Sequence, residues 1–425
     1  MGDPRSLALV VVAALGLSLA PAAGGPAARS EGASPWHEGS RDTAQSETHT
    51  YYVAAEPVAW DYAPSGRDRL TGARFDTTSA RFPGKPRSEY VRYPNAVETN
   101  YAPGLQEGLE TVGHVYRKVL YREYTDSTFT ERVERPERWE HLGMLGPLLR
   151  AEVGDTIEVV FRNMADRPYS MHPHGVSYEK DSEGKRYRDG TSGADKEDGA
   201  VPPGETHTYV WPEPERAGPG PEEPSSKLWM YHSHVREDED INTGLVGPMI
   251  VTRRGMAGPN GVPRDVDREF VTMFFSSVES DSWLYPENIR EHTSLSVDSA
   301  TAQPGFGNTH FMESVNGFAY ANMPRPTMRV GENVRWYLFT GPNLGENHST
   351  HWHATTALYR GRHPDMIDLG AMMMAVADMT PDNPGTWLYH CHVDVHFEAG
   401  MSAMYRVLPR DETAAGPDSR GEEPR

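Results

Sequence analysis

The segment Trp387–Met401, with the sequence W-L-Y-H-C-H-V-D-V-H-F-E-A-G-M, carries the strongest structural signal in the chain. It contains Cys391, the single cysteine among 425 residues, directly between His390 and His392. If Trp387–Val393 is a β-strand, successive side chains point to opposite faces. The two histidines would then share one face, and the cysteine thiolate would lie on the other. This pattern predicts metal sites on both sides of one strand.

The thiolate side of this strand has further soft ligands within reach. His396 lies four residues after His392, and Met401 lies five residues after His396. Two imidazoles, one thiolate and a weak axial thioether are the ligands of a mononuclear blue-copper site, which transfers single electrons. The segment therefore predicts such a site beside Cys391.

The composition is that of an all-β protein with about two domains. The chain has 40 glycines and 35 prolines, which suit many turns between strands. Its formal net charge of −20 argues against nucleic acid and anionic membranes as partners. With one cysteine the chain cannot form an internal disulfide.

The two ends of the chain are interpreted as segments outside the folded core. Residues 1–22 are predicted to be a secretory signal, because Leu7–Ala20 is apolar and small residues follow it. An uncleaved membrane anchor is the alternative. Residues 23–47 and 411–425 are predicted to be a disordered leader and tail. We therefore expect a secreted protein, extracellular or periplasmic, without membrane attachment after cleavage.

The rest of the chain is a tandem repeat of one β unit. The sequence A-E-V-G-D-T-I-E-V-V-F-R-N at 151–163 returns as M-R-V-G-E-N-V-R-W-Y-L-F-T at 328–340. We expect domains at 48–254 and 267–410, joined by a linker at 255–266. Because the pattern has no long helical periodicity, the predicted fold is all-β, with two Greek-key β-sandwiches.

Three local predictions accompany this organisation. The alternating segment Thr48–Tyr62 is expected to be the first strand, and Val112–Thr125 another strand. The segment Glu213–Ser226, rich in Pro, Glu, Gly and Ser, is expected to be a solvated surface loop.

Four histidine clusters occur at matching places in the two halves. The first half has H-P-H-G and H-S-H, and the second half has H-S-T-H-W-H and H-C-H-V-D-V-H. If His348, Cys391, His396 and Met401 form the mononuclear site, eight imidazoles remain, four from each half. These eight are His172, His174, His232, His234, His351, His353, His390 and His392. Eight imidazoles suit three ions held where two domains meet, and the neighbouring thiolate site makes copper the consistent metal.

These clusters resemble the ligand motifs of multicopper oxidases over nearly all of Thr48–Pro409. The finer sequence is similar to ceruloplasmin, hephaestin and the A domains of blood-coagulation factors. The similarity is carried by Tyr121–Thr130, His141–Pro147, Thr243–Met249 and Val315–Asn322. In domain number, and in having a thiolate only in the second domain, the chain resembles the bacterial two-domain small laccases.

The resemblance implies cupredoxin-type domains and four coppers per chain, one of type 1, one of type 2 and two of type 3. It implies the type 1 ligands His348, Cys391, His396 and Met401. It implies the type 2 ligands His172 and His351, and the type 3 ligands His174, His232, His234, His353, His390 and His392. In this family, single electrons from a reducing substrate pass from type 1 copper through the cysteine to its two histidine neighbours. Four electrons then reduce O₂ to water.

The resemblance also suggests roles outside the ligand set. Tyr178 matches an auxiliary redox tyrosine, with packing in the core as the alternative role. Glu183 matches an acidic residue that supplies protons, with Glu179 and Asp181 as alternatives and a solvated turn as the simpler interpretation. Ser233 replaces the cysteine in the first half, so we expect no type 1 copper there.

Assembly is inferred from the same resemblance. Ceruloplasmin-like proteins hold six such domains in a ring, and three two-domain chains would make the same ring. We therefore expect a homotrimer with its three-copper clusters between neighbouring chains, closed by cyclic symmetry.

Two classes of electron donor make different demands on the residues around the type 1 site. A phenol-oxidising, laccase-like enzyme needs little specific machinery, whereas an iron-oxidising enzyme needs carboxylates near the type 1 site. Asp394, Glu398 and Asp365, with His363, are the available groups, but Val395 and Tyr359–Gly361 depart from ceruloplasmin's iron-site pattern. We expect a small phenol as the main substrate and a metal-ion oxidase, for Fe²⁺ or Cu⁺, as the alternative.

Two further interpretations were weighed. The run Met372–Met374, with Met366 and Met379, suggests a soft Cu⁺ site, but core packing is the simpler interpretation. An alternative of another class is a copper-poor binding module like the coagulation-factor A domains. All twelve ligand positions are filled here, which argues against that module.

Overall fold

The computed structural model describes residues 46–75, 111–302, 306, 310–342 and 347–410. The predicted signal segment, nearly all of the predicted leader and the predicted tail lie outside these residues. No helix in the described part of the chain is long and apolar enough to cross a membrane.

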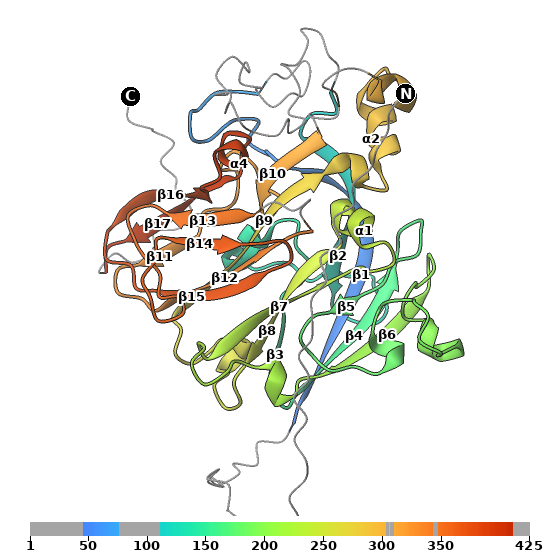
Figure 1. Ribbon diagram of the computed structural model, residues 1–425, viewed down its shortest axis with the longest axis horizontal. Coiled ribbons are helices and arrows are strands. Elements are labelled where there is room, and N and C mark those ends of the chain that lie inside the picture. The colour runs from blue at the N-terminus through green and yellow to red at the C-terminus, as the bar shows by residue number, and fades with distance from the viewer. Residues whose placement is uncertain (1–45, 76–110, 303–305, 307–309, 343–346, 411–425) are drawn as a thin grey trace, which may run out of the picture. The chain divides into compact units, whose positions relative to one another are not determined.

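The described first half contains two four-stranded sheets (Figure 1). One has the order β2-β1-β4-β6, and the other has the order β3-β8-β7-β5. The bounds are β1 Thr48–Asp61, β2 Val115–Tyr124, β3 Leu149–Glu152, β4 Thr156–Asn163, β5 His172–Pro173, β6 Thr206–Pro212, β7 Ser226–His232 and β8 Val246–Thr252. The predicted strands at 48–62 and 112–125 are confirmed as β1 and β2.

The second half repeats this topology strand for strand. Its sheets have the orders β10-β9-β12-β15 and β11-β17-β16-β13-β14, so β14 is the one addition. The bounds are β9 Arg268–Val278, β10 Phe311–Val315, β11 Thr327–Arg329, β12 Val334–Thr340, β13 His348–Trp352, β14 Met366–Leu369, β15 Met374–Met379, β16 Gly385–Cys391 and β17 Ser402–Leu408. In both halves the first strand pairs in parallel with the third strand of its sheet. The tandem repeat is therefore a repeat of structure as well as of sequence.

The described helices are short. The α-helices are α1 Glu237–Thr243, α2 Tyr285–His292, α3 Val297–Thr301 and α4 Asp394–Glu398. The 3-10 turns are η2 Glu137–Leu142, η3 Lys180–Ser182, η4 Gly193–Lys196, η5 Glu215–Ala217, η6 Pro259–Gly261 and η7 Glu279–Asp281. The all-β prediction is confirmed.

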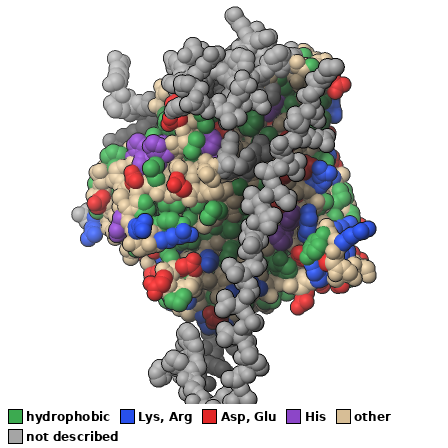
Figure 2. Space-filling model, in the orientation of Figure 1, with side chains coloured by type: hydrophobic (Ala, Val, Ile, Leu, Met, Phe, Trp, Pro, Cys, Tyr) green, Lys and Arg blue, Asp and Glu red, His purple; other side chains and the backbone are tan. Residues whose placement is uncertain are grey.

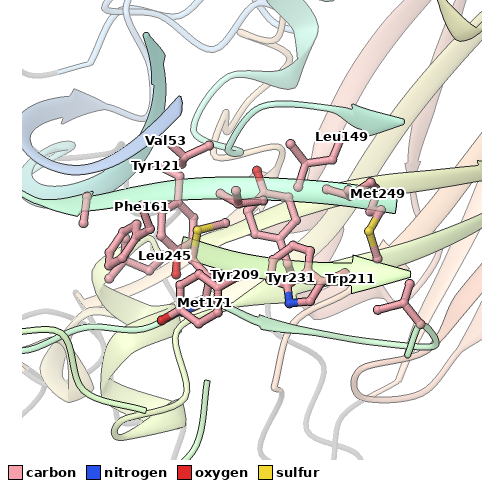
Figure 3. Packing of buried hydrophobic residues seen from close by; sticks show 14 of the residues in the cluster. Val53, Tyr121, Leu149, Phe161, Met171, Tyr209, Trp211, Tyr231, Leu245 and Met249 are labelled. Atoms are coloured by element: carbon pink, nitrogen blue, oxygen red, sulfur yellow. The ribbon is translucent and has the colours of Figure 1, made fainter. Parts of the chain in front are cut away.

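Side-chain alternation builds the core of the first half. Along β4, buried and partly exposed residues alternate without exception, and Ile157, Val159 and Phe161 point inward. They pack with Tyr209 and Trp211 of β6 and with residues of the facing sheet (Figure 3). A corresponding cluster in the second half includes Cys391 and Met401.

A third apolar cluster joins the two halves. Strands β8 and β12 are buried along their whole length. One face of each strand packs on the other sheet of its own half, and the opposite face contacts the other half of the chain. The cluster contains Leu142, Leu145, Leu228, Met230, Ile241, Val246 and Ile250 of the first half and Val271, Met273, Phe275, Tyr337 and Phe339 of the second. Among the described residues, no sheet contains strands from both sides of 255–266, and the exact domain boundaries remain a prediction.

Two local predictions need correction. The segment Glu213–Ser226 is only partly solvated, since Glu213 and Ala217 are buried. The reason is that the Glu213 backbone pairs with the turn at Gly154. The prediction of core packing is wrong for Met366 and Met373, which are 41% and 46% exposed.

Candidate metal centres

The buried thiolate lies between two imidazole rings. Cys391 ends β16 and is fully buried. Its Sγ is 3.6 Å from Nδ1 of His396 in α4 and 3.8 Å from Nδ1 of His348, the first residue of β13. The three ligand atoms all lie within 4.8 Å of one another.

Backbone hydrogen bonds hold Met401 beside Cys391 and His396. Its amide donates to the carbonyl of His396 at 2.9 Å, and its carbonyl accepts from the amide of Cys391 at 3.1 Å. Met401 is fully buried, as is the thiol. One thiolate, two imidazoles and a nearby thioether in an apolar core are a donor set that fits copper.

Four histidines form a second group on the opposite face of β16. His351 and His390 are directly opposite each other on the antiparallel strands β13 and β16. The Nε2 atoms of His353 and His390 are 3.2 Å apart, and the ring of His392 is 5.1 Å from the ring of His351. We call His351, His353, His390 and His392 the second quartet. The period-two prediction placed the two neighbours of Cys391 on this face.

The first half contains an equivalent group, the first quartet, formed by His172, His174, His232 and His234. His172 of β5 lies opposite His232, the last residue of β7. The Nε2 atoms of His174 and His232 are 3.0 Å apart, and the rings of His172 and His234 are 5.1 Å apart.

Backbone carbonyls orient the rings in both quartets. Nδ1 of His172 contacts the Glu183 carbonyl at 2.6 Å, and Nδ1 of His351 contacts the Asp365 carbonyl at 3.0 Å. Nδ1 of His390 contacts the carbonyl of the next residue at 2.7 Å, and the first half has the same contact at His232. These hydrogen bonds leave Nε2 free to bind a metal ion.

Burial keeps several of the quartet imidazoles neutral. Desolvation, with a smaller contribution from neighbouring imidazoles, lowers the pKa of His174, His234 and His390 to about 4. A neutral ring keeps the lone pair that a metal ligand needs. These neutral rings are able to bind metal at neutral pH.

The two quartets are separate groups. In the described part of the chain, every close set of ligand atoms and every ring contact between two histidines joins residues of one half. His353 and His392 are exposed, and Figure 2 shows histidine side chains at the surface on the side where Figure 1 places β16. A cluster using all eight imidazoles is therefore not assembled from these contacts.

Residues with other predicted roles lie near the first quartet. The ring of Tyr178 is 6.0 Å from that of His172, and this tyrosine also packs against the first core. Glu183 contacts His172 through its carbonyl, while its carboxylate binds Lys180 and Tyr187. The structure thus gives Glu183 an orienting contact that the sequence did not predict.

Two acidic residues near the first quartet were missed by the sequence reasoning. Glu237 carboxylate oxygens lie 3.5 Å from His234 Nδ1 and 3.9 Å from His232 Nε2. Asp240 is 1% exposed and accepts a hydrogen bond from Ser233. Both belong to the acidic run at 237–240, which in sequence resembles a solvated helix start, so no local signal distinguished them.

Comparisons with known proteins identify the family. Two models of the multicopper oxidase family match residues 141–255 and 293–411, which together span more than half of the chain. Mouse (Mus musculus) ferroxidase HEPHL1 is 39% identical over 383 residues, covering 89% of this chain and 31% of the relative. Human (Homo sapiens) ceruloplasmin is 36% identical over 364 residues, covering 84% of this chain and 32% of the relative.

The chain therefore spans about a third of the length of these relatives. The solved structure of the multicopper oxidase mgLAC covers 88% of this chain and 90% of its own, with a TM-score of 0.52 and 18% identity. This likeness supports a cupredoxin-type fold, and the family implies copper as the cofactor. By its two family matches and its ceruloplasmin-like sequence, the chain belongs to the multicopper oxidase family.

Proposed function

We propose that this protein is a copper oxidase that couples one-electron oxidation of a metal ion, Fe²⁺ in the first place, to reduction of O₂ to water. The observation that carries the oxidase proposal is the strand His390–Cys391–His392. One face of it presents a buried thiolate with two imidazoles, and the other presents a histidine quartet. The peptide bonds between these three consecutive residues thus link the two kinds of site covalently.

The residue roles are those expected from the ligand motifs. His348, Cys391, His396 and Met401 would hold type 1 copper. His172 and His351 would hold type 2 copper, and the other six quartet histidines, His174, His232, His234, His353, His390 and His392, would hold the type 3 pair. Copper in these sites would supply the one-electron redox chemistry and bind O₂. The protein keeps the thiolate buried, and backbone carbonyls orient the rings of His172, His232, His351 and His390.

Each complete cluster would form between two chains. The separation of the quartets within the chain supports this arrangement, since each quartet supplies only half of the eight imidazoles. Head-to-tail contacts that close into a ring would bring the first quartet of one chain to the second quartet of the next. We propose the homotrimer for this ring, with four coppers per chain.

A mixing experiment tests the site between chains. His232→Ala removes a first-quartet ligand, and His390→Ala removes a second-quartet ligand, so neither variant alone has an intact cluster. After equal mixing and reassembly with copper, about one quarter of the clusters would pair two intact quartets, and oxidase activity would return to that level. Activity that stays absent after confirmed subunit exchange would contradict clusters between chains, and the mass of the assembly would test the trimer.

The metal-ion substrate replaces our expectation of a phenol. A relative named as a ferroxidase, 39% identical over 89% of this chain, favours it. Asp394 is exposed and Glu398 is partly exposed, and both lie on α4, the five-residue helix that carries His396. Carboxylate oxygens beside the type 1 ligands suit a hard cation such as Fe²⁺.

Oxygen consumption with different electron donors tests the substrate. With Fe²⁺, Cu⁺ and a phenol as sole donors, kcat/KM should be highest for Fe²⁺. The pair Asp394→Asn and Glu398→Gln should lower kcat/KM for Fe²⁺ by about tenfold or more while changing the phenol rate little, a loss of ~1.4 kcal/mol in transition-state stabilisation. Asp368→Asn, which changes an exposed aspartate of β14, is the matched control. A phenol preference, or equal losses with both donors, would contradict the proposal.

A further inference from the structure

The residue that replaces the cysteine in the first half lies in a buried hydrogen-bond network. Ser233 follows the last residue of β7 and is fully buried. Its Oγ donates to Oδ2 of Asp240 at 2.7 Å and accepts from the amide of Ser170 at 3.1 Å. The amide of His234 donates to Oγ of Ser170 at 3.0 Å. His232 and His234, the two quartet residues on either side of Ser233 in the sequence, are thus held by this network.

Asp240 is the centre of the network. It lies in α1 and is 1% exposed. Besides the Ser233 hydroxyl, it accepts from the amide of Arg236 at 3.0 Å and, on Oδ1, from the indole Nε1 of Trp283 at 2.9 Å. All of these partners are donors, and hydrogen bonds to an ionised acceptor are stronger than neutral ones. The carboxylate is therefore anchored by protein groups and needs no cation.

The network crosses from one half to the other. Trp283 lies between η7 and α2 of the second half, and its amide donates to Oγ1 of Thr243 in α1 at 3.1 Å. Its indole ring lies 4.9 Å from the guanidinium carbon of Arg167 and 5.5 Å from that of Arg236. A rigid aromatic group of the second half thus fixes the carboxylate beside the first quartet.

We propose that Asp240 is a positioning residue for the first quartet. Acting through Ser233, it holds His232 and His234 in the geometry that the cluster copper requires. It performs the task that a metal ion held by Cys391, His348 and His396 would perform for His390 and His392 in the second half. This inference rests on the proposed copper-oxidase function, and it predicts that the first quartet is ordered before any metal binds.

The physical reason is the cost of an unpaired group in a buried network. Removing the charge of Asp240 leaves at least one buried donor, on Ser233 or Trp283, without its acceptor, so the strand end can shift. Metal sites respond to such changes, because loss of a residue that orients a ligand typically lowers metal affinity by about 10–100-fold.

The test compares Asp240→Asn with Asp238→Asn, an exposed aspartate on the same short helix. Asp240→Asn should lower the copper affinity of the clusters by about 10–100-fold, with loss of the type 3 absorption, while the blue band of the second half persists. Asp238→Asn should leave both unchanged. Wild-type copper affinity and spectra in Asp240→Asn, even with a lower melting temperature, would overturn the proposal.

Ser233→Ala provides the second variant if Asp240→Asn does not fold. It cuts the link between the carboxylate and the histidine strand but leaves the Trp283 and Arg236 contacts in place. The same selective loss of cluster copper, smaller in size, is expected, and unchanged cluster affinity would overturn the proposal. If the wild-type protein binds no cluster copper at all, the proposed function itself fails, which is a different result.

Discussion

The two halves of the chain use the same pair of sheets but secure their central histidine strands in different ways. In the second half, His390 and His392 flank a thiolate that faces two imidazoles, a set suited to a metal ion. In the first half, the equivalent position is Ser233, hydrogen-bonded to a buried aspartate. One scaffold can therefore present a histidine quartet on one face while its other face holds either a metal ligand or a polar network.

The comparison also explains why the halves are not interchangeable. The one cysteine of the chain lies in the second half, so in the proposed oxidase electrons from a substrate would enter there. The histidines of the first half would depend, in the proposed arrangement, on the hydrogen bond that Trp283 of the second half donates to Asp240. In the proposed oxidase, this difference would assign electron entry to the second half and supporting copper ligands to the first.

The largest effect is expected from removing the thiolate. Cys391→Ser makes the second half resemble the first, but without an aspartate partner for the new hydroxyl. The blue absorption band and all turnover should be lost, while some cluster copper remains. Absorption spectroscopy, copper analysis and O₂ consumption check this, and a blue, active variant would contradict the assignment of Cys391.

A first-quartet variant should stop O₂ reduction without disturbing the thiolate site. His172→Ala should keep the blue band, because the thiolate site lies in the other half, but O₂ reduction should stop. After substrate is added anaerobically and then O₂, the blue band should stay bleached in the variant and return in the wild-type protein. Bleaching followed by normal recovery would show that the first quartet is not needed.

The interface between the halves can be tested by its buried ion pair. Lys118 of β2 and Glu279 of η7 are both fully buried, and the ammonium also donates to the Asn242 carbonyl at 2.7 Å. Lys118→Met leaves a buried carboxylate without its charge partner, so the free energy of unfolding should fall by about 3–5 kcal/mol.

The neighbouring pair provides a matched control for this measurement. Arg117, beside Lys118, pairs with Glu291 on the exposed surface. Arg117→Met should change stability little, because exposed pairs are weak. In denaturant unfolding, both halves of Lys118→Met should unfold together at lower denaturant. Separate unfolding transitions for the two halves in the wild-type protein would mean that the interface does not make them unfold as one unit.

The smallest expected effect is on the pH dependence of stability and comes from one residue of the first half. Glu213 is buried, and neither carboxylate oxygen has a hydrogen-bond partner among the described residues. Burial, with a contribution from Asp155, raises its pKa to about 8. Because this folded-state pKa is above the unfolded value of about 4.5, the folded state holds the proton more strongly, and stability falls as pH rises from about 4.5 to 8.

Glu213→Gln should remove this pH dependence. The variant should gain stability relative to the wild-type protein as pH rises from about 5 to 8, by on the order of a few kcal/mol at most. Melting temperatures of both proteins across this range check it. Parallel pH profiles would show that Glu213 ionises normally in the folded protein.

Much of the fold and of the ligand grouping could be predicted because the signals are local. Alternation along β16 placed Cys391 and its neighbours on opposite faces, and the structure groups the thiol with His348 and His396. The repeat of histidine pairs indicated two related halves. By contrast, the exposure of Met366 and the burial of Glu213 were misjudged, because local hydropathy does not report which face the rest of the fold covers.

The sequence by itself determined the all-β class, the tandem repeat and the two kinds of ligand group, since these follow from spacing along single strands. Only the tertiary structure decided that the quartets form separate groups and that Ser233 is anchored to Asp240. It also decided that Trp283 reaches that aspartate from 43 residues away and that Lys118 meets Glu279 across 161 residues. Such contacts depend on how the sheets pack, and no periodicity in a single strand encodes them.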